Sequence, residues 1–221
     1  MSEVASVNGE KGGACNEEEL LLFISSRRSS KLLREGEVPL QKVIRALEVA
    51  TTAPSAHNAQ PWRVVVIEDR EVLRELLEAM AEEWRRDLRS DGLPNWKVEA
   101  IVRESMKRTL RASVVVVVCM TMRGMDRYPD ERRNACERVM AIQSVAAFIQ
   151  NLLLALHAMG LGACWRCGPL FAPDAVRRVL NLPEDFEPQA LVEIGLPGGT
   201  RDAERKALSE VAALNRWGRP L

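Results

Sequence analysis

The chain lacks a net charge, because 31 Lys and Arg residues balance 31 Asp and Glu residues. Nucleic acids and acidic membranes attract proteins with excess positive charge, so we expect neither as a partner. A long apolar run is also missing: the longest is Val114 to Met120, whereas a bilayer span needs about 20 residues. The first residues have neither the basic nor the apolar region of a signal peptide, which predicts a cytoplasmic protein.

Cysteine and histidine are scarce, at five and two residues. Five irregularly spaced cysteines do not make a disulfide scaffold. Cys119 and Cys136 are predicted to be small buried residues in a strand and a helix. Cys164 and Cys167 form a CWRC pair, but neither histidine is spaced to complete a structural zinc site, so we expect no metal. A redox dithiol at this pair stays an open alternative.

Aromatic residues make up only 5% of the chain, but 47% hydrophobic and 28% charged residues are typical of a folded globular protein. Residues 1–15 are rich in Gly, Ser, Asn and Glu without any period, which predicts a disordered leader. Residues 16–221 show no repeat and no interior linker. Their length predicts a single domain.

Hydrophobic periodicity, caps and breakers predict the secondary structure. Helices are expected over residues 17–28, 40–51, 71–88, 95–110, 132–159, 174–180 and 207–215, and strands over 63–67, 114–120 and 189–194. Helices outnumber strands and do not alternate strictly with them, which indicates an α+β fold with helices covering a small sheet. The helix from Val139 to Leu156 is apolar on nearly every side, so we expect it to be buried all round, in part at a subunit interface.

Three separated stretches carry residues suited to ligand binding. RRSSK, at 27–31, offers cations and hydroxyls to a phosphate, although arginines also suit a helix C-terminus. APSAHNAQPW, at 53–62, is a polar loop fixed by two prolines, although Ser and Asn also serve tight turns. GLGACWRCGP, at 160–169, has glycines that let backbone approach a planar ligand, although it also fits a helix C-cap and turn.

Other chemistry is not supported. No phosphate-binding P-loop occurs, and GLGACW lacks the preceding strand of a dinucleotide fingerprint. No nucleophile elbow accompanies the two histidines, so a Ser-His-acid hydrolase has no support. His157 is expected to be a hydrogen-bonded core residue, and His57 a positioning residue.

Over residues 18–217 the chain resembles the FMN-dependent nitroreductase family. The resemblance lies in four features in the same order: RRSSK, APSAHNAQPW before a strand, an apolar helix ending in MGLGACW, and PQALVEIGLP. The resemblance implies a three-layer α-β-α sandwich with a small mixed, mainly antiparallel sheet and a long buried central helix. Three further stretches are similar to the C-terminal reductase domain of the bifunctional protein that makes the deazaflavin coenzyme F-420. They are MAEEWRRDLRSDG, YPDERRNACERVM and LFAPDAVRRVLNLP. That domain is understood to reduce a dehydro precursor with reduced FMN, and no ligase activity is expected here.

The resemblance also implies FMN as cofactor, with the chemistry at flavin N5 and no catalytic side chain. The cations and hydroxyl of the first stretch would hold the phosphate and ribityl chain: Arg27, Arg28, Ser29 and Lys31. The isoalloxazine edge near N5 would be lined, chiefly by backbone groups, by Trp165, Cys167 and Gly168.

A homodimer follows from the same resemblance, because the loop of one subunit would reach the flavin of the other. The loop residues concerned are Pro54, Ser55, Ala56 and Asn58. Near the C-terminus the family places a Lys, one residue and an Arg for the phosphate. Arg205 matches the Arg, Ala203 replaces the Lys, and Arg201 or Lys206 would compensate.

The leading functional hypothesis is therefore an FMN oxidoreductase that uses NAD(P)H or a reduced deazaflavin and acts on a planar conjugated substrate, such as a dehydro precursor of a deazaflavin coenzyme. The alternatives are a broad NAD(P)H nitro or quinone reductase and a non-catalytic flavin- or deazaflavin-binding protein. Substrate choice is expected to lie in the helices around Trp84 to Arg108.

Overall fold

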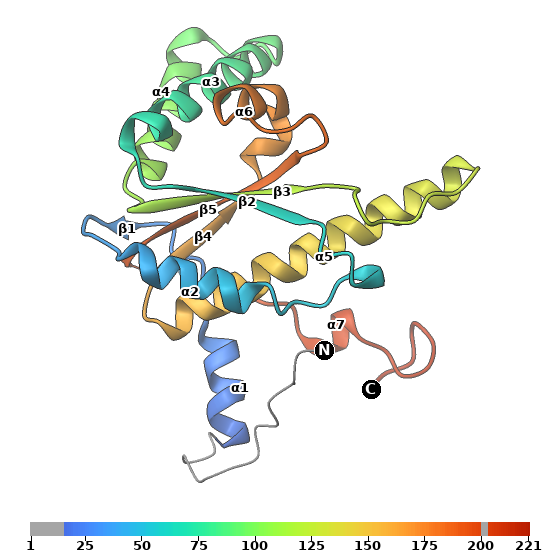
Figure 1. The fold of residues 1–221 in the computed structure, drawn as a ribbon. Helices are drawn as coiled ribbons and strands as arrows, with labels where there is room; N and C mark the ends of the chain where they lie inside the picture. Colours follow the sequence, from blue (N-terminus) through green and yellow to red (C-terminus); the bar gives the residue numbers. More distant parts are fainter. Residues whose placement is uncertain (1–15, 200–202) are drawn as a thin grey trace, which may run out of the picture.

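The computed structural model describes residues 16–199 and 203–221, which form one sheet covered by helices on both faces (Figure 1). The predicted leader, residues 1–15, lies outside this range. The α-helices are α1 (Glu17–Ser26), α2 (Leu40–Ala50), α3 (Arg70–Ser90), α4 (Asn95–Thr109), α5 (Glu131–Ala158), α6 (Pro173–Val179) and α7 (Leu208–Val211). The strands are β1 (Leu33–Arg34), β2 (Trp62–Ile67), β3 (Val114–Met120), β4 (Gly162–Arg166) and β5 (Glu187–Pro197). Two 3-10 turns, η1 (Ala56–Asn58) and η2 (Gly168–Phe171), complete the fold.

The sheet has the strand order β1-β5-β3-β2, with β4 paired to β5. Every pairing among these strands is antiparallel. Strand β3 lies between β2 and β5, and all seven of its residues are buried. A strand covered on both faces needs no polar alternation, which explains its unbroken apolar sequence.

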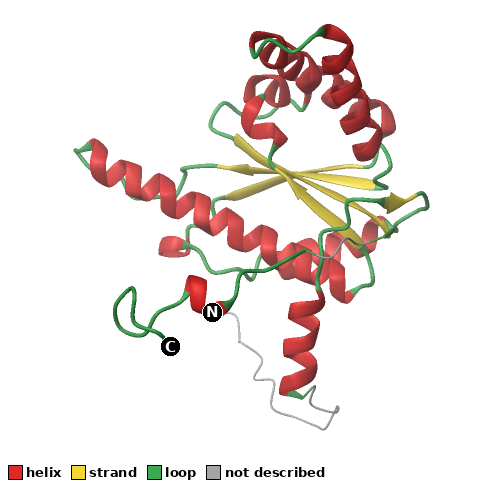
Figure 2. Cartoon of the chain, turned by 180° about the vertical axis from the view of Figure 1, so that it is seen from behind, coloured by secondary structure: helices red, strands yellow, loops and turns green. Residues whose placement is uncertain are grey.

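The side chains of β3 alternate between two separate cores. Val114, Val116 and Val118 belong to the core shared with α2 and α5, whereas Val115 and Val117 belong to the core shared with α3 and α6. Figures 1 and 2 show the resulting three layers, with α2 and α5 on one face of the sheet and α3, α4 and α6 on the other. The α+β sandwich expected from the sequence is confirmed.

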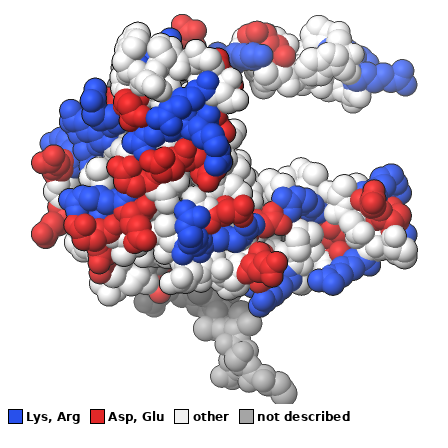
Figure 3. All heavy atoms as spheres, turned by 90° about the horizontal axis from the view of Figure 1, so that it is seen from above, with Lys and Arg blue, Asp and Glu red and all other residues white. Residues whose placement is uncertain are grey.

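The outer face of the α3–α4 layer carries both signs of charge side by side (Figure 3). Arg85 on α3 contacts Glu82 on the same helix and Glu99 on α4. Such interspersed charges give this face no single-sign patch that would attract a polyanion.

Helix α5 is buried along only part of its length. Phe148, Ile149 and Leu152 are at most 1% exposed, whereas Val139 and Ile142 keep 51% and 40% of their surface exposed. Figure 1 shows the N-terminal part of α5 extending beyond the sheet. The expectation of burial all round was therefore wrong for this part within a single chain. By length and composition α5 could cross a membrane, but half of its most apolar 18-residue window is buried in the fold.

Both described chain ends extend away from the body (Figures 1 and 2). Helix α1 is capped by Asn16, yet it has no buried residue and exposes Leu21 and Leu22. Helix α7 is only four residues long, instead of the expected 207–215. A short helix is marginal unless tertiary packing supports it, and no residue of α7 is buried. The C-terminal segment leaves Trp217 79% exposed.

Two strands escaped the sequence analysis. β1 has only two residues, and β4 lies within the stretch taken as a cap and turn. β4 is defined by its pairing with β5, for example Ala163 with Ile194, which is a contact between distant parts of the chain. Cys136 was also predicted to be buried but is exposed, because it lies on the projecting part of α5.

Candidate functional site

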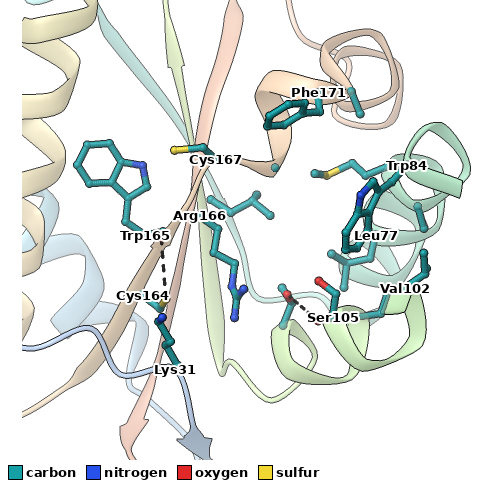
Figure 4. Close-up of a pocket in the computed structure, with 17 residues that line it drawn as sticks. Lys31, Leu77, Trp84, Val102, Ser105, Cys164, Trp165, Arg166, Cys167 and Phe171 are labelled. Atoms are coloured by element: carbon teal, nitrogen blue, oxygen red, sulfur yellow. Dashed lines mark hydrogen bonds between the residues drawn. The ribbon is translucent and has the colours of Figure 1, made fainter. Parts of the chain in front are cut away.

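A cavity of about 560 Å³ opens between strands β4 and β5 and helices α3 and α4 (Figure 4). Cys164, Arg166 and Leu191 lie on its sheet side. Leu77 of α3 and Val102 of α4 face them across the cavity. Its size and mostly apolar lining with a few polar groups are typical of small-molecule sites.

Large side chains stand at the mouth of this cavity. Trp84 comes from α3 and Phe171 from η2, and Phe171 is 74% exposed. The segment from Trp84 to Arg108 was expected to cover the substrate site, and Trp84, Val102 and Ser105 do line the cavity.

An ion pair is built into the cavity floor. Arg166 Nε lies 2.6 Å from Glu193 Oε1, and the Thr109 hydroxyl donates to the same oxygen at 2.6 Å. Glu193 is only 1% exposed. Burial alone would lower the pKa of Arg166, but the adjacent Glu193 carboxylate raises that pKa overall, so the guanidinium stays charged.

The RRSSK stretch runs beside β4. The Ser30 N–H donates to the Ala163 carbonyl at 2.9 Å, and Lys31 lines the cavity rim. The structure therefore brings the first and third stretches together, with Lys31 and Arg166 as two cations in one cavity.

Arg27, Arg28 and Ser29 do not line this cavity. Arg28 donates to the backbone carbonyls of Ser25 and Arg27, which is the helix-terminal role left open by the sequence. Ser29 is exposed.

Trp165, Cys167 and Gly168 all line the cavity, at the junction of β4 and η2. The buried Trp165 Nε1 has no hydrogen-bond partner among the described residues. A Cβ added to Gly168 would lie 3.2 Å from Met80 Cε, so glycine keeps this edge open. Cys164 and Cys167 are free thiols, and burial raises the pKa of Cys164, which makes it a poor nucleophile.

The APSAHNAQPW loop lies on the opposite face of the sheet. Its backbone is held by its own side chains, since Ser55 Oγ accepts from the Gln60 N–H at 3.1 Å. The Ala56 N–H donates to Ser144 Oγ on α5 at 3.1 Å, and the closing Trp62 ring stacks on Phe148. Pro54, Ser55, Ala56 and Asn58 are thus ordered, but they do not reach the cavity of their own chain.

The His57 side chain connects this loop to α5. Its backbone is left-handed, with φ 55°, and its Nε2 lies 3.3 Å from Glu137 and 4.0 Å from Asp126. Within residues 16–199 and 203–221 this is the one group of potential metal ligands, with ligand atoms within 4.8 Å of one another. This contact places the His57 ring against the buried Glu137 carboxylate of α5. The positioning role expected for His57 stays a prediction.

The C-terminal cations are separate from the cavity. Arg205 and Lys206 are exposed, and Arg205 donates to the nearby carbonyls of Ala203 and Glu204. Arg201 lies outside the described residues.

Arg166, Glu193 and Thr109 were not among the site residues expected from the sequence. A usable signal was present, because Glu193 interrupts the apolar run ALVEIGL and a charge in a buried strand requires a partner. Arg166 was overlooked because CWRC was considered for its cysteines rather than for the alternation of a strand.

Comparison with known proteins identifies the family of the chain and supports its fold. The model of the nitroreductase family matches residues 24–196. A candidate NADH dehydrogenase/NAD(P)H nitroreductase of Archaeoglobus fulgidus is 29% identical over 188 residues, covering 84% of this chain and 89% of that protein. A BluB-like flavoprotein of Clostridium difficile shares the fold, with a TM-score of 0.75 and 22% identity over 90% of this chain and 99% of that one. A candidate nitroreductase of Desulfovibrio desulfuricans, solved in complex with FMN, has a TM-score of 0.67 and 25% identity over 91% of this chain and 99% of that one.

Proposed function

The chain belongs to the nitroreductase family, and from this premise we propose that it is an FMN-dependent oxidoreductase. Electrons would pass from a nicotinamide or deazaflavin donor to a planar conjugated substrate. The observation that carries the proposal is the cavity beside β4, in which Lys31 and Arg166 face an apolar space of about 560 Å³. The FMN complex of the Desulfovibrio relative supports the choice of cofactor.

The residues in the cavity fit a flavin. Arg166 Nη2 is a buried donor without a partner among the described residues, and a ring carrying carbonyl oxygens and nitrogens would supply an acceptor. The bare Cα of Gly168 leaves room at the cavity edge. Bound FMN would supply the hydride and electron chemistry, which is consistent with the absence of an activated nucleophile in this cavity.

The side chains of this chain then bind and orient. Lys31 and Arg166 favour a ligand edge that carries negative charge. Trp84 and Phe171 offer flat apolar surfaces on which a planar substrate would stack. Arg27, Arg28 and Ser29, with Arg205 and Lys206, are proposed to hold the phosphate and ribityl chain, which lie outside the enclosed cavity.

We also propose that the protein is a homodimer with a shared site. The exposed apolar residues of α1, of the C-terminal segment and of the projecting part of α5 support this, because surfaces of this kind usually mark interfaces. Pro54, Ser55, Ala56 and Asn58 would then approach the flavin of the partner subunit. A cytoplasmic location remains part of the proposal.

A narrower substrate class is favoured by the sequence stretches that resemble the deazaflavin reductase. The stretch MAEEWRRDLRSDG contributes Met80 and Trp84 to the cavity, and the stretch LFAPDAVRRVLNLP contributes Phe171 and Ala172. A dehydro precursor of a deazaflavin coenzyme is therefore our preferred substrate class. A broad NAD(P)H nitro or quinone reductase and a flavin-binding protein without turnover are the competing outcomes.

The test begins with the absorbance spectrum of the purified protein and the mass of any released ligand. FMN is expected, and a colourless protein that takes up no added FMN would refute the proposal. Turnover with NADH, NADPH and a reduced deazaflavin, each paired with a nitroaromatic, a quinone and a dehydro-deazaflavin acceptor, separates the enzyme classes. FMN that is bound but reoxidised by none of these acceptors would favour the binding protein.

A further inference from the structure

The guanidinium of Arg166 has one end that the protein leaves unpaired. Its Nη2 is buried and has no hydrogen-bond partner among the residues that the structure describes. The Arg166 side chain is 24% exposed and lines the cavity (Figure 4). Since a buried donor without an acceptor is costly, this arrangement indicates that an acceptor arrives with the ligand.

Two elements, β5 and α4, hold the other end of Arg166. Its Nε contacts Glu193 of β5 at 2.6 Å, and Thr109, the last residue of α4, donates to the same carboxylate oxygen at 2.6 Å. The Glu193 carboxylate is therefore held from two sides at 1% exposure. Because a guanidinium is planar and rigid, fixing Nε also fixes the direction of Nη2.

The charges around Arg166 leave its donor end positive. Glu193 offsets the charge on the Nε side, whereas Lys31 adds a second cation at the rim. Burial raises the pKa of the adjacent Cys164, so its thiol contributes no negative charge at neutral pH.

We propose that Arg166 is a ligand-binding residue whose Nη2–H donates to a carbonyl oxygen or ring nitrogen of the flavin bound in this cavity, and that Glu193 and Thr109 are the residues that position it. The inference rests on the proposed function. A fixed cation stabilises the reduced flavin, which carries more negative charge, better than the oxidised flavin. Arg166 therefore increases FMN affinity and also raises the midpoint potential of the bound flavin.

The experiment measures FMN affinity by fluorescence titration and the midpoint potential by spectroelectrochemistry. Arg166→Met removes the donor and is expected to weaken FMN binding roughly tenfold or more, as for other hydrogen bonds from charged donors. The midpoint potential is expected to fall as well, because the variant should lose more affinity for reduced FMN than for oxidised FMN. Each tenfold difference between these two losses of affinity lowers the potential by about 30 mV. Arg166→Lys keeps the positive charge but loses the planar guanidinium group. Its midpoint potential should therefore lie between that of Arg166→Met and that of the wild type.

A folding control is built into the variants. Arg166→Met leaves the Glu193 carboxylate unpaired, so Arg166→Met/Glu193→Gln removes both charges and keeps the shape of the network. Glu193→Gln alone loosens the positioning of Arg166 and is expected to lower FMN affinity less than the double variant does. Arg178→Met, on an exposed position of α6, is the matched control and should change neither quantity.

The outcomes separate the two proposals. A wild-type protein that takes up no FMN refutes the proposed function and this inference together. A wild-type protein that binds FMN, with a folded double variant of the same affinity and midpoint potential, refutes only the role of Arg166. Lower FMN affinity with an unchanged potential also contradicts the inference, because a purely structural role would give that result.

Discussion

Ile142→Arg tests the proposed dimer more directly than any change in the buried part of α5. Ile142 is 40% exposed in the single chain, whereas Leu152 is fully buried. Burying the remaining surface of an isoleucine contributes about 1 kcal/mol, scaled from ~1.5–3 kcal/mol for a whole side chain. An arginine there also loses hydration without a partner, at several kcal/mol per ion. An isologous interface contains each substitution twice, so we expect a loss above ~4 kcal/mol, or about a thousandfold in Kd.

The assay is sedimentation at several protein concentrations, with flavin absorbance followed beside protein absorbance. The wild type should sediment as a dimer that carries FMN, and Ile142→Arg as a folded monomer with little FMN. Leu152→Arg is the comparison variant, because it places an unpaired charge inside the chain's own core and should fail to fold at all. Urea unfolding of Ile142→Arg checks that its fold is intact. An Ile142→Arg protein that remains a dimer, or a monomer that keeps its full FMN content, would refute the reasoning.

Three further predictions concern residues of the proposed flavin and substrate site. Arg27→Ala should weaken FMN binding roughly tenfold to a hundredfold without changing the urea midpoint of the FMN-free protein, and unchanged affinity in a titration would return Arg27 to a helix-terminal role. Iodoacetamide at neutral pH should label the exposed Cys167 before Cys164, whose pKa is raised by burial, as read by peptide mass spectrometry; equal labelling would contradict the buried environment. Phe171→Ala should raise KM for a planar acceptor a few-fold while FMN affinity stays constant, since Phe171 stands at the mouth of the cavity; an unchanged KM would remove it from the substrate site.

Most of the fold was predictable because its elements carry strong local signals. The unbroken apolar run of β3 required cover on both faces, and it has that cover. The helix expected from residue 17 does begin there, because the Asn16 side chain caps α1. The short α7 was overestimated, because local propensity alone does not sustain a helix without packing.

The site was less predictable, because it depends on contacts between distant parts of the chain. β4 becomes a strand only by pairing with β5, which places Arg166 beside Glu193. The spacing of residues in CWRC contains no information about that partner. Lys31, Trp165, Cys167 and Gly168, which the resemblance implies for the flavin site, all line the cavity, but their role there stays a prediction. The resemblance held no counterpart for the Arg166–Glu193–Thr109 network.

The division of the site between two faces of the sheet gives the dimer proposal its functional meaning. Lys31 reaches the cavity on the α3–α4 face because Ser30 binds the backbone of β4. The loop containing Asn58 is anchored on the other face, through Ala56 and Ser144 of α5. One sheet separates the two stretches in a single chain, so they can act on one flavin only if a second copy supplies the loop. Dissociation should then release FMN even though the cavity itself stays intact, which is why the loss of dimer and the loss of flavin are expected at the same protein concentration.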